Sequence, residues 1–166
     1  MANELFIGVA DMRVSNDPSA ILITQALGCC IGVSVYDPVA RVGGLLHFML
    51  PNAGISKTRT DKAKKNPYMF ADTGVPLFFQ EAYRYGADKE RMVIKIAGGA
   101  QIKNSTGLFN FNIGKHNYVA LREIFQENDV PIHEEDVGGN VPRTMRLEIA
   151  TGRVCLEVPG RKAREL

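Results

Sequence analysis

Six segments of the chain either alternate hydrophobic and polar residues or form short apolar runs rich in β-branched side chains. Segments of this kind, about four to eight residues long, are typical of β-strands. The predicted strands are Leu5–Val9, Cys30–Tyr36, Gly44–Met49, Met92–Ala97, Met145–Ile149 and Val154–Val158. We expect the short stretch Ala150–Gly152 to turn the last two strands into a hairpin.

Hydrophobic residues return with helical spacing between Thr73 and Gly86. Thr73 belongs to a residue type that caps helices, Pro76 suits a first turn, and Gly86 is a common stop signal. The pattern therefore predicts a helix that turns four side chains toward the core: Leu77, Phe78, Ala82 and Tyr85.

A second helix is predicted to begin after Asn117, as its capping residue, and to end at Asn128. Its core-facing side chains are Leu121, Ile124 and Phe125. A third helix is expected between Pro18 and Ala26. Together these patterns predict the α+β class, with a single layered domain over residues 1–166 in which β-sheets pack against about three helices.

Size and composition agree with one compact domain. The chain has 166 residues, 45% of them hydrophobic, and a chain near 150 residues buries roughly 70% of its unfolded surface. Twenty Lys and Arg residues nearly balance 18 Asp and Glu residues, which leaves a net charge of +2. Because no overall positive field indicates nucleic-acid binding, we expect none.

Positive charge is concentrated in one polar stretch, residues 52–66, with the sequence "NAGISKTRTDKAKKN". Its only acid is Asp61, and its basic residues are Lys57, Arg59, Lys62, Lys64 and Lys65. Two interpretations remain open. The stretch is either a solvated loop or a basic surface that receives an acidic partner.

The N-terminal segment and the cysteines bear on where the protein works. The segment "MANELFIGVADMRVS" contains Glu4 and Asp11 and lacks the positively charged start of a signal peptide. No apolar run reaches the roughly 18 residues of a membrane span, so we expect no membrane insertion. Three cysteines make a poor disulfide framework, which fits a reducing compartment. We therefore expect a cytoplasmic protein.

His47 lies in "GGLLHFML", a run that otherwise reads as a buried strand, where an imidazole is costly unless it has partners. One interpretation is a histidine satisfied within the core. The other is a pair with Cys30, because residues 37–43 can turn the chain and make the two strands antiparallel neighbours. A cysteine acts as a nucleophile through its thiolate, which needs such a base nearby.

Cys29 and Cys30 are adjacent, so on a strand their side chains point to opposite faces, one toward a site and the other toward the interior. Each of them, like Cys155, is also a common core residue. Zinc and redox sites are disfavoured because the sequence has no C-x-x-C pair and no second histidine at ligand spacing from His47. We expect no metal or other cofactor. A cysteine hydrolase or acyl-transfer enzyme remains possible on this pattern.

The stretches "TQALGCCIGVSVYDP" and "GGLLHFMLP" resemble the CheD family of chemoreceptor glutamine deamidases. Thr24 lies six positions before Cys30, and His47 lies seventeen after it, which are the family's spacings for a Cys-His-Thr triad. The resemblance continues over residues 19–158, and further motifs appear in the family's order: "KIAGGAQI", "NIGKHN", "EDVGGNVPR" and "ATGRV".

Three positions depart from the family's pattern. Cys29 stands where the family usually has Ser, which leaves Cys30 as the aligned nucleophile and suggests that Cys29 is inert. His116 stands where the family often has Arg. Pro142 replaces a common Gly and fixes the backbone φ angle of its loop.

The resemblance implies hydrolysis of glutamine side-chain amides in methyl-accepting chemotaxis receptors to glutamate and ammonia. It implies Cys30 as nucleophile, His47 as acid and base, and Thr24 as the residue that orients the imidazole. Gly28 and the backbone amides near Cys29 and Cys30 are expected to support the oxyanion. The residues that bind substrate are not indicated.

The resemblance also implies partners and alternatives. The partners are the cytoplasmic helices of the receptors and a CheC-type phosphatase. From its local charge alone, the basic stretch of residues 57–65 is the expected contact with receptor helices. One alternative is a non-catalytic adaptor that binds receptors and stimulates that phosphatase. Another is an amidase for a different protein glutamine. Receptor methylesterase activity, which uses the same thioester chemistry, also remains open.

Overall fold

The computed structural model describes residues 1–102 and 112–166. Its strands are β1 Asn3–Ile7, β2 Asp11–Ser15, β3 Ala20–Leu27, β4 Ile31–Asp37, β5 Val42–Phe48, β6 Val93–Gly98, β7 Glu134–Val137, β8 Arg143–Glu148, β9 Val154–Glu157 and β10 Arg164–Glu165. Its α-helices are α1 Lys57–Lys65, α2 Ala71–Arg84 and α3 Ile113–Glu127. Two short 3₁₀ helices are η1 Pro67–Met69 and η2 Lys89–Arg91.

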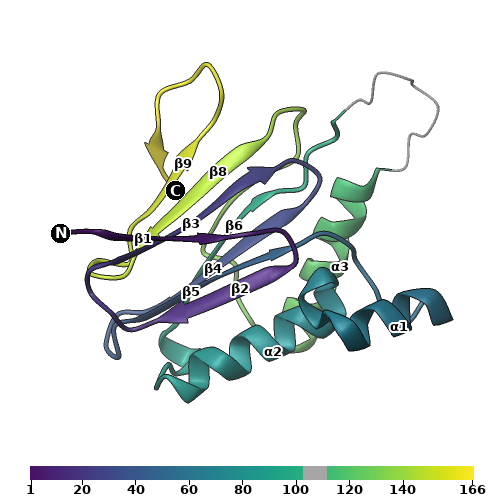
Figure 1. The fold of residues 1–166 in the computed structure, drawn as a ribbon, viewed down its shortest axis with the longest axis horizontal. Helices are drawn as coiled ribbons and strands as arrows, with labels where there is room; N and C mark the ends of the chain where they lie inside the picture. Colours follow the sequence, from purple (N-terminus) through teal and green to yellow (C-terminus); the bar gives the residue numbers. More distant parts are fainter. Residues whose placement is uncertain (103–111) are drawn as a thin grey trace.

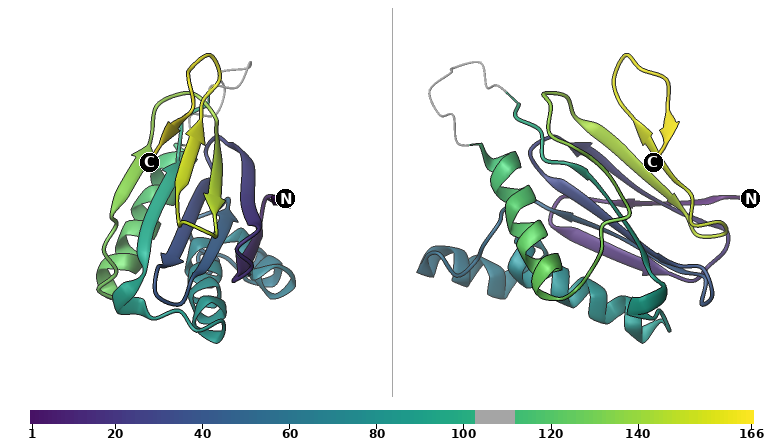
Figure 2. Two further views of the ribbon diagram at one scale, coloured as in Figure 1. Left: turned by 90° about the vertical axis from the view of Figure 1, so that its left-hand side faces the viewer. Right: turned by 180° about the vertical axis from the view of Figure 1, so that it is seen from behind.

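The strands form two five-stranded sheets (Figure 1). The first sheet has the order β1-β3-β8-β9-β10, and the second has the order β2-β5-β4-β6-β7. One face of the second sheet packs on α2 and α3, and its other face packs on the first sheet (Figure 2). The molecule therefore has three layers, which confirms the predicted α+β class and its layered arrangement.

The strand β5 shows how closely the layers approach. A Cβ atom on Gly43 would lie 2.6 Å from Cδ1 of Ile149, the residue after β8 of the first sheet, and a Cβ atom on Gly44 would lie 2.7 Å from Cε2 of Phe78 in α2. Neither position has space for a side chain. The two contacts also show that successive residues of β5 point to opposite layers, as a strand requires.

All six predicted strands are present, each within two residues of its predicted ends. The predicted hairpin is also confirmed, since β8 and β9 pair in antiparallel fashion on either side of residues 150–152. The predicted helix between Pro18 and Ala26 is wrong. Those residues belong mainly to β3, which pairs with β1 on one side and β8 on the other and contains the β-branched residues Ile21, Ile23 and Thr24.

The structure corrects several details of the two predicted helices. α2 begins at Ala71, so Thr73 lies inside it, and Leu77 and Tyr85 are exposed rather than turned inward. α3 begins at Ile113, and its cap is Asn112, whose side chain accepts a hydrogen bond from the backbone of Lys115. The start of α2 gives a weak signal because Phe70, at its N-cap, makes no side-chain capping bond, whereas α3 has a favourable cap in Asn112, five residues before the predicted one.

The basic stretch is a helix rather than a loop. α1 spans Lys57–Lys65, and the side chain of Ser56 caps its first turn by accepting a hydrogen bond from the backbone of Arg59. Ala63 is its only buried residue. The predicted solvation was therefore correct for most of the segment, although the predicted loop was wrong.

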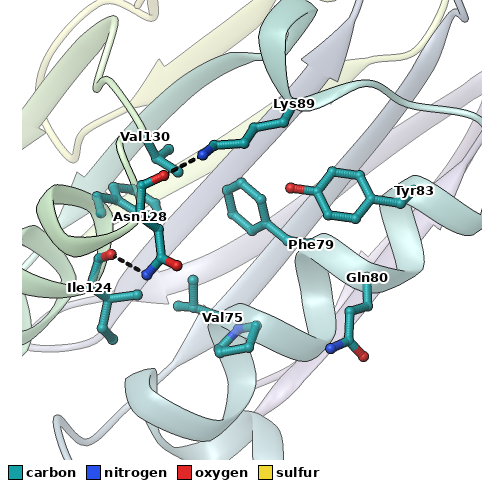
Figure 3. A pocket seen from close by; sticks show the side chains of 10 residues that line it. Val75, Phe79, Gln80, Tyr83, Lys89, Ile124, Asn128 and Val130 are labelled. Carbon is teal, nitrogen blue, oxygen red and sulfur yellow. Dashed lines mark hydrogen bonds between the residues drawn. The ribbon is translucent and has the colours of Figure 1, made fainter.

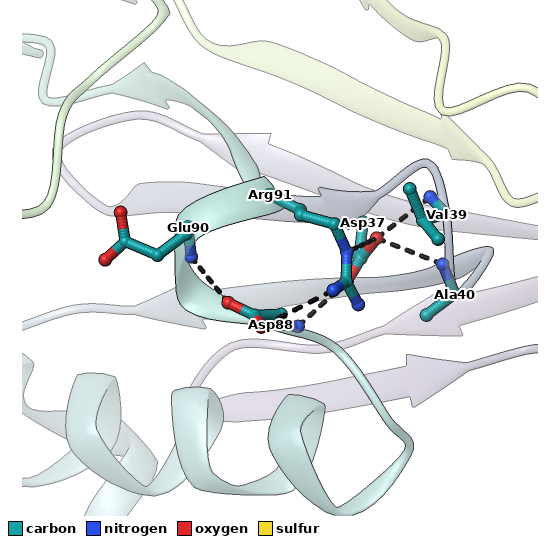
Figure 4. Close-up of polar contacts among 6 residues, drawn as sticks. All are labelled: Asp37, Val39, Ala40, Asp88, Glu90 and Arg91. Atoms are coloured by element: carbon teal, nitrogen blue, oxygen red, sulfur yellow. Dashed lines mark hydrogen bonds and ion pairs between the residues drawn. The ribbon is translucent and has the colours of Figure 1, made fainter.

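Asp37 ties the end of β4 to the segment before β6 (Figure 4). Its buried carboxylate accepts hydrogen bonds from the backbone N–H groups of Val39, Ala40 and Asp88, and from the guanidinium of Arg91 at 2.8 Å. Burial by itself raises the pKa of a carboxyl group, but the bonds from Arg91 and the three amides outweigh it and lower the pKa of Asp37 to about 2. Asp37 is therefore a charged structural anchor of the turn between β4 and β5.

Candidate active site

Thr24 and His47 meet at the boundary between the two sheets. Thr24 lies on β3 of the first sheet, and His47 lies on β5 of the second. By strand alternation His47 shares the face of Gly43, which is directed toward the first sheet. The Oγ1 atom of Thr24 and the Nδ1 atom of His47 are 2.7 Å apart, and both side chains are fully buried.

The hydrogen bonds of Thr24 fix the tautomer of His47. The threonine hydroxyl has one hydrogen, which it donates to the carbonyl oxygen of Ile7 at 2.8 Å. Toward His47 the same oxygen is therefore the acceptor, and Nδ1 of the imidazole carries the proton. A neutral imidazole with its proton on Nδ1 has a lone pair on Nε2. This form can take a proton from a thiol.

Burial keeps His47 neutral, because removal from water disfavours the imidazolium and lowers the pKa of His47 to about 4. Its Nε2 atom is buried and has no hydrogen-bond partner within residues 1–102 and 112–166. A histidine that only fills the core has its polar atoms paired. The geometry therefore favours a reactive role for His47 over the alternative of a satisfied core histidine.

Cys30 lies just before β4, close to the position opposite His47. Gly32 is the residue that pairs with His47 in the antiparallel β4–β5 ladder, which confirms the predicted pairing of these strands. Cys30 comes two residues before Gly32, directly ahead of the first residue of β4. Cys30 is half-buried and packs against the apolar cluster between the two sheets.

The prediction that strand alternation separates Cys29 from Cys30 is wrong. β3 ends at Leu27 and β4 begins at Ile31, so both cysteines lie in the bend between the strands, where alternation does not apply. A hydrogen bond from the Cys30 thiol lowers the pKa of Cys29 to about 6. Burial raises this pKa, whereas the backbone N–H groups of Cys29 and Cys30 lower it further. The same thiol–thiol bond, together with burial, raises the pKa of Cys30. Cys29 thus affects the ionisation of the proposed nucleophile.

Backbone contacts hold this bend in place. Ala26 has a left-handed φ of 57°, and the N–H of Gly28 donates to the carbonyl of Ala26 at 2.9 Å. The residues after β6 secure the other side, since Gly99 N–H donates to Cys30 O and Ala100 N–H donates to Gly28 O, both at 2.8 Å. A non-glycine residue rarely adopts such a φ unless its surroundings impose it. The cysteines therefore sit on a backbone that tertiary contacts define.

Asn117 is a residue of this region that sequence reasoning assigned to the wrong role. It is not the cap of α3 but lies within the helix, fully buried. Its Nδ2 group donates to the carbonyl of Cys29 at 2.9 Å and to the carbonyl of Met49 at 3.0 Å. Both acceptors are distant in sequence, so helical spacing alone gave no signal for these contacts.

The remaining histidines and Cys155 lie elsewhere. His116 is exposed on α3, and the Nδ1 atom of His133 accepts a hydrogen bond from the backbone of Ile94 at 3.0 Å. Cys155 lies in β9 and is half-buried. Pro142 is exposed beside Arg143, whose guanidinium pairs with Asp136 at 2.8 Å. None of these groups has a contact with Thr24 or His47 among those found in the described part of the chain.

Two of the surface grooves beside the helices bear on where the site lies. One lies between the chain after β5 and the start of α3 and is lined mainly by apolar and basic residues, including Ile55, Arg59, Ile113, Lys115, His116 and Val119. The other lies between α2 and α3 around Phe79, Tyr83, Ile124 and Val130 (Figure 3). Because the α2–α3 groove contains no thiol or imidazole, it is not the candidate active site.

Among the residues that the structure describes, no group of three or more His, Cys, Asp or Glu side chains is arranged to hold a metal ion. The described helices also include none that is long and apolar enough to cross a membrane. The chemical groups that stand out are the cysteine pair and the His47–Thr24 pair.

A neutral imidazole with a free Nε2 atom, on a strand next to the one that a cysteine precedes, fits a cysteine-dependent hydrolase. The chain belongs to the CheD family, whose model, described as "CheD chemotactic sensory transduction", matches residues 49–158. This confirms the resemblance seen in the sequence motifs.

Relatives extend the match over nearly the whole chain. A Syntrophus aciditrophicus protein named "Probable chemoreceptor glutamine deamidase CheD 1" is 48% identical over 163 residues, covering 98% of this chain and 99% of that protein. A Solibacter usitatus protein named "Probable chemoreceptor glutamine deamidase CheD" is 44% identical over 159 residues, covering 96% and 91%. A solved structure, the Neisseria meningitidis protein NMB0706, has a TM-score of 0.45 and 8% identity over 84% of this chain and 63% of that chain, too distant to support a conclusion.

Proposed function

We propose that this protein is a cytoplasmic protein-glutamine deamidase that hydrolyses glutamine side-chain amides of methyl-accepting chemotaxis receptors to glutamate and ammonia. The observation that carries the proposal is the His47 imidazole, buried and neutral, with its proton held on Nδ1 by Thr24 and Nε2 left free. Membership of the CheD family and the names of the relatives support the same activity.

In the first step, the sulfur of Cys30 attacks the carboxamide carbon of the glutamine while the thiol proton passes to Nε2 of His47. A carbon–sulfur bond forms, and the carbonyl π electrons move onto oxygen. The backbone N–H groups of Cys29 and Cys30 already favour negative charge, since both lower the pKa of Cys29. They are therefore the proposed donors to the oxyanion. Gly28, which precedes them in the same bend, is proposed to support this backbone.

In the second step, the imidazolium of His47 protonates the nitrogen of the tetrahedral intermediate, the carbon–nitrogen bond breaks, and ammonia leaves. Water then attacks the thioester, giving its proton to Nε2, and the thiol departs with that proton as glutamate forms. Thr24 keeps Nδ1 as a donor throughout, so the same nitrogen of His47 faces the reaction in each step.

The direct test is mass spectrometry of receptor cytoplasmic fragments after incubation with the purified protein, which detects conversion of Gln to Glu. We expect Cys30→Ser and His47→Ala to abolish conversion, whereas Cys155→Ser, which changes a half-buried cysteine in β9, keeps it. Loss of activity in Cys29→Ser with activity retained in Cys30→Ser would assign the nucleophile to the other cysteine. A wild-type protein that converts no receptor glutamine would overturn the deamidase proposal.

The receptor-facing surface is proposed to include α1 and the adjoining groove, whose lining contains three basic residues and the acid Glu123. Lys57, Lys62, Lys64 and Lys65 are exposed on α1, and Asp61 is the only acid there. Arg59 of α1 and Lys115 and His116 of α3 line the groove that follows β5, the strand of His47. An acidic receptor helix complements such a surface, and attraction of this kind weakens with salt.

The triple change of Lys62, Lys64 and Lys65 to Gln tests this surface. We expect weaker receptor binding and a smaller dependence of binding on salt concentration, while Arg161→Gln with Lys162→Gln, two exposed charges near the C-terminus, serves as the control. Equal affinity and equal salt dependence in the α1 variant and the wild type would refute the assignment. A CheC-type phosphatase is a second proposed partner, and wild-type binding to it without any receptor deamidation would favour the adaptor alternative.

A further inference from the structure

The buried amide of Asn117 joins two distant backbone segments. An amide nitrogen has two hydrogens, and both are used, one for the carbonyl of Cys29 at 2.9 Å and the other for the carbonyl of Met49 at 3.0 Å. The orientation of the amide is unambiguous, because only its NH₂ end can face two carbonyl oxygens. Its Oδ1 atom is buried and has no hydrogen-bond partner among the residues described.

The two bridged segments are those that carry the proposed nucleophile and base. Cys29 immediately precedes Cys30, and Met49 lies two residues after His47, just beyond the end of β5. The β4–β5 ladder begins only at the pair Ile31–Phe48. The strand hydrogen bonds therefore do not fix the carbonyls of Cys29 and Met49 to each other, and Asn117 makes this connection instead.

We infer that Asn117 is a positioning residue, which sets the distance between the Cys30 thiol and the Nε2 atom of His47 by holding both segments from α3. The inference rests on the proposed function, because it concerns how that site is aligned. Asn117 does not touch the imidazole or the thiols in the contacts found, so it acts through the backbone. A displacement of about 1 Å at a reacting pair can cost roughly a hundredfold in rate.

A merely structural role for Asn117, anchoring α3 to the sheet, makes a different prediction. Such a role lowers the stability of the fold without changing the reactivity of the folded molecules. Asn128 provides the matched control, since its side-chain amide also donates to a backbone carbonyl, that of Ile124 at 2.8 Å, but at the exposed end of the same helix (Figure 3).

The experiment compares Asn117→Ala with Asn128→Ala in a Cys29→Ser, Cys155→Ser background, where Cys30 is the only thiol. The rate of Cys30 alkylation by iodoacetamide is measured from pH 5 to pH 10 below the melting temperature of each variant, together with kcat and KM on receptor fragments. For Asn117→Ala we expect kcat to fall by roughly ten- to a hundredfold and KM to change less than about twofold. We also expect the dependence of the Cys30 alkylation rate on pH to shift along the pH axis. Asn128→Ala should keep both properties of its parent.

If Asn117→Ala does not fold, Asn117→Ser provides the same test, because its shorter side chain has one hydrogen and cannot serve both carbonyls. Folded variants at Asn117 with the parent's kcat and alkylation profile would overturn the inference. The alkylation arm needs no receptor. If the wild-type protein fails to deamidate receptors, the proposed function fails, while the alkylation profiles still decide the role of Asn117.

Discussion

Replacement of Thr24 by valine tests the tautomer argument most directly. Valine has nearly the shape of threonine and suits a strand, so β3 keeps its backbone. The change removes one hydroxyl that makes two contacts, the 2.8 Å bond to the Ile7 carbonyl and the 2.7 Å contact with Nδ1 of His47. Both contacts of the hydroxyl are then lost inside the sheet interface.

The magnitude follows from these two contacts. Leaving a buried polar group unpaired costs about 1–3 kcal/mol. The loss at Ile7 falls on folding stability alone. The loss at Nδ1 also falls on the reaction, because the ring is free to turn or to move its proton to Nε2, the atom that must be unprotonated. We therefore expect the activation free energy to rise by about 1–3 kcal/mol, which corresponds to a fall in kcat of roughly 5- to 150-fold.

The assay is the initial rate of Gln-to-Glu conversion in a receptor fragment at saturating concentration, at a temperature where both variants are folded. Thr24→Ser keeps the hydroxyl and should retain kcat within about threefold of the wild type. A Thr24→Val protein that is folded and has the wild-type kcat would refute the claim that Thr24 fixes the tautomer of His47.

Four further outcomes are expected. In a Cys155→Ser background, Cys29→Ser removes the thiol that raises the pKa of Cys30, so Cys30 should be alkylated faster near pH 7 than when Cys29 is present. An unchanged alkylation rate contradicts the thiol–thiol contact. The activity of the wild type should rise as the pH passes about 4 and persist to neutral pH, because His47 must be neutral; a midpoint near its ordinary 6.5 contradicts the role of burial. Asp37→Asn should lower the free energy of unfolding by about 2 kcal/mol at neutral pH, because folding lowers the pKa of Asp37 from 3.8 to about 2. This contribution is present above pH 3.8 and is lost as the pH falls through 2, so urea melts over that range measure it. A difference between the two proteins that persists at the lowest pH argues against the ion pair. Gly98→Ala should lower the melting temperature strongly, because its Cβ would lie 2.2 Å from the Cys30 carbonyl at a φ of +116°, whereas Gly54→Ala, with nothing within 4 Å, should not.

The strands and part of the site could be predicted from the sequence because they depend on local pattern. β4 and β5 are buried throughout, so most of their residues are apolar. The spacing of Thr24, Cys30 and His47 within the motifs singled out residues of which two are in hydrogen-bond contact. β3 was missed because its run of apolar residues, buried on both sides over much of its length, has no strict alternation to distinguish it from a helix.

The contacts that shape the cysteine bend could not be predicted in the same way. The left-handed φ of Ala26 lies at a register shift between Thr24 and Leu27 in the pairing with β8, and residues 99–100 anchor the bend that follows. Asn117 reaches two carbonyls 88 and 68 positions away in sequence. Such side-chain-to-backbone contacts leave no periodic signal, so they become visible only in the folded structure.

The energetics of His47 and Cys30 constrain how the proposed reaction begins. His47 has a pKa of about 4, and the pKa of Cys30 is raised, so proton transfer alone would create an unfavourable pair of buried charges. Transfer coupled to attack on the substrate avoids this state, because negative charge moves from sulfur to an oxygen that faces backbone amides. The imidazolium then formed is a stronger acid than that of an ordinary histidine, which favours protonation of the amide nitrogen, a poor leaving group. Burial of His47 thus weakens the base needed for attack but strengthens the acid needed for loss of ammonia.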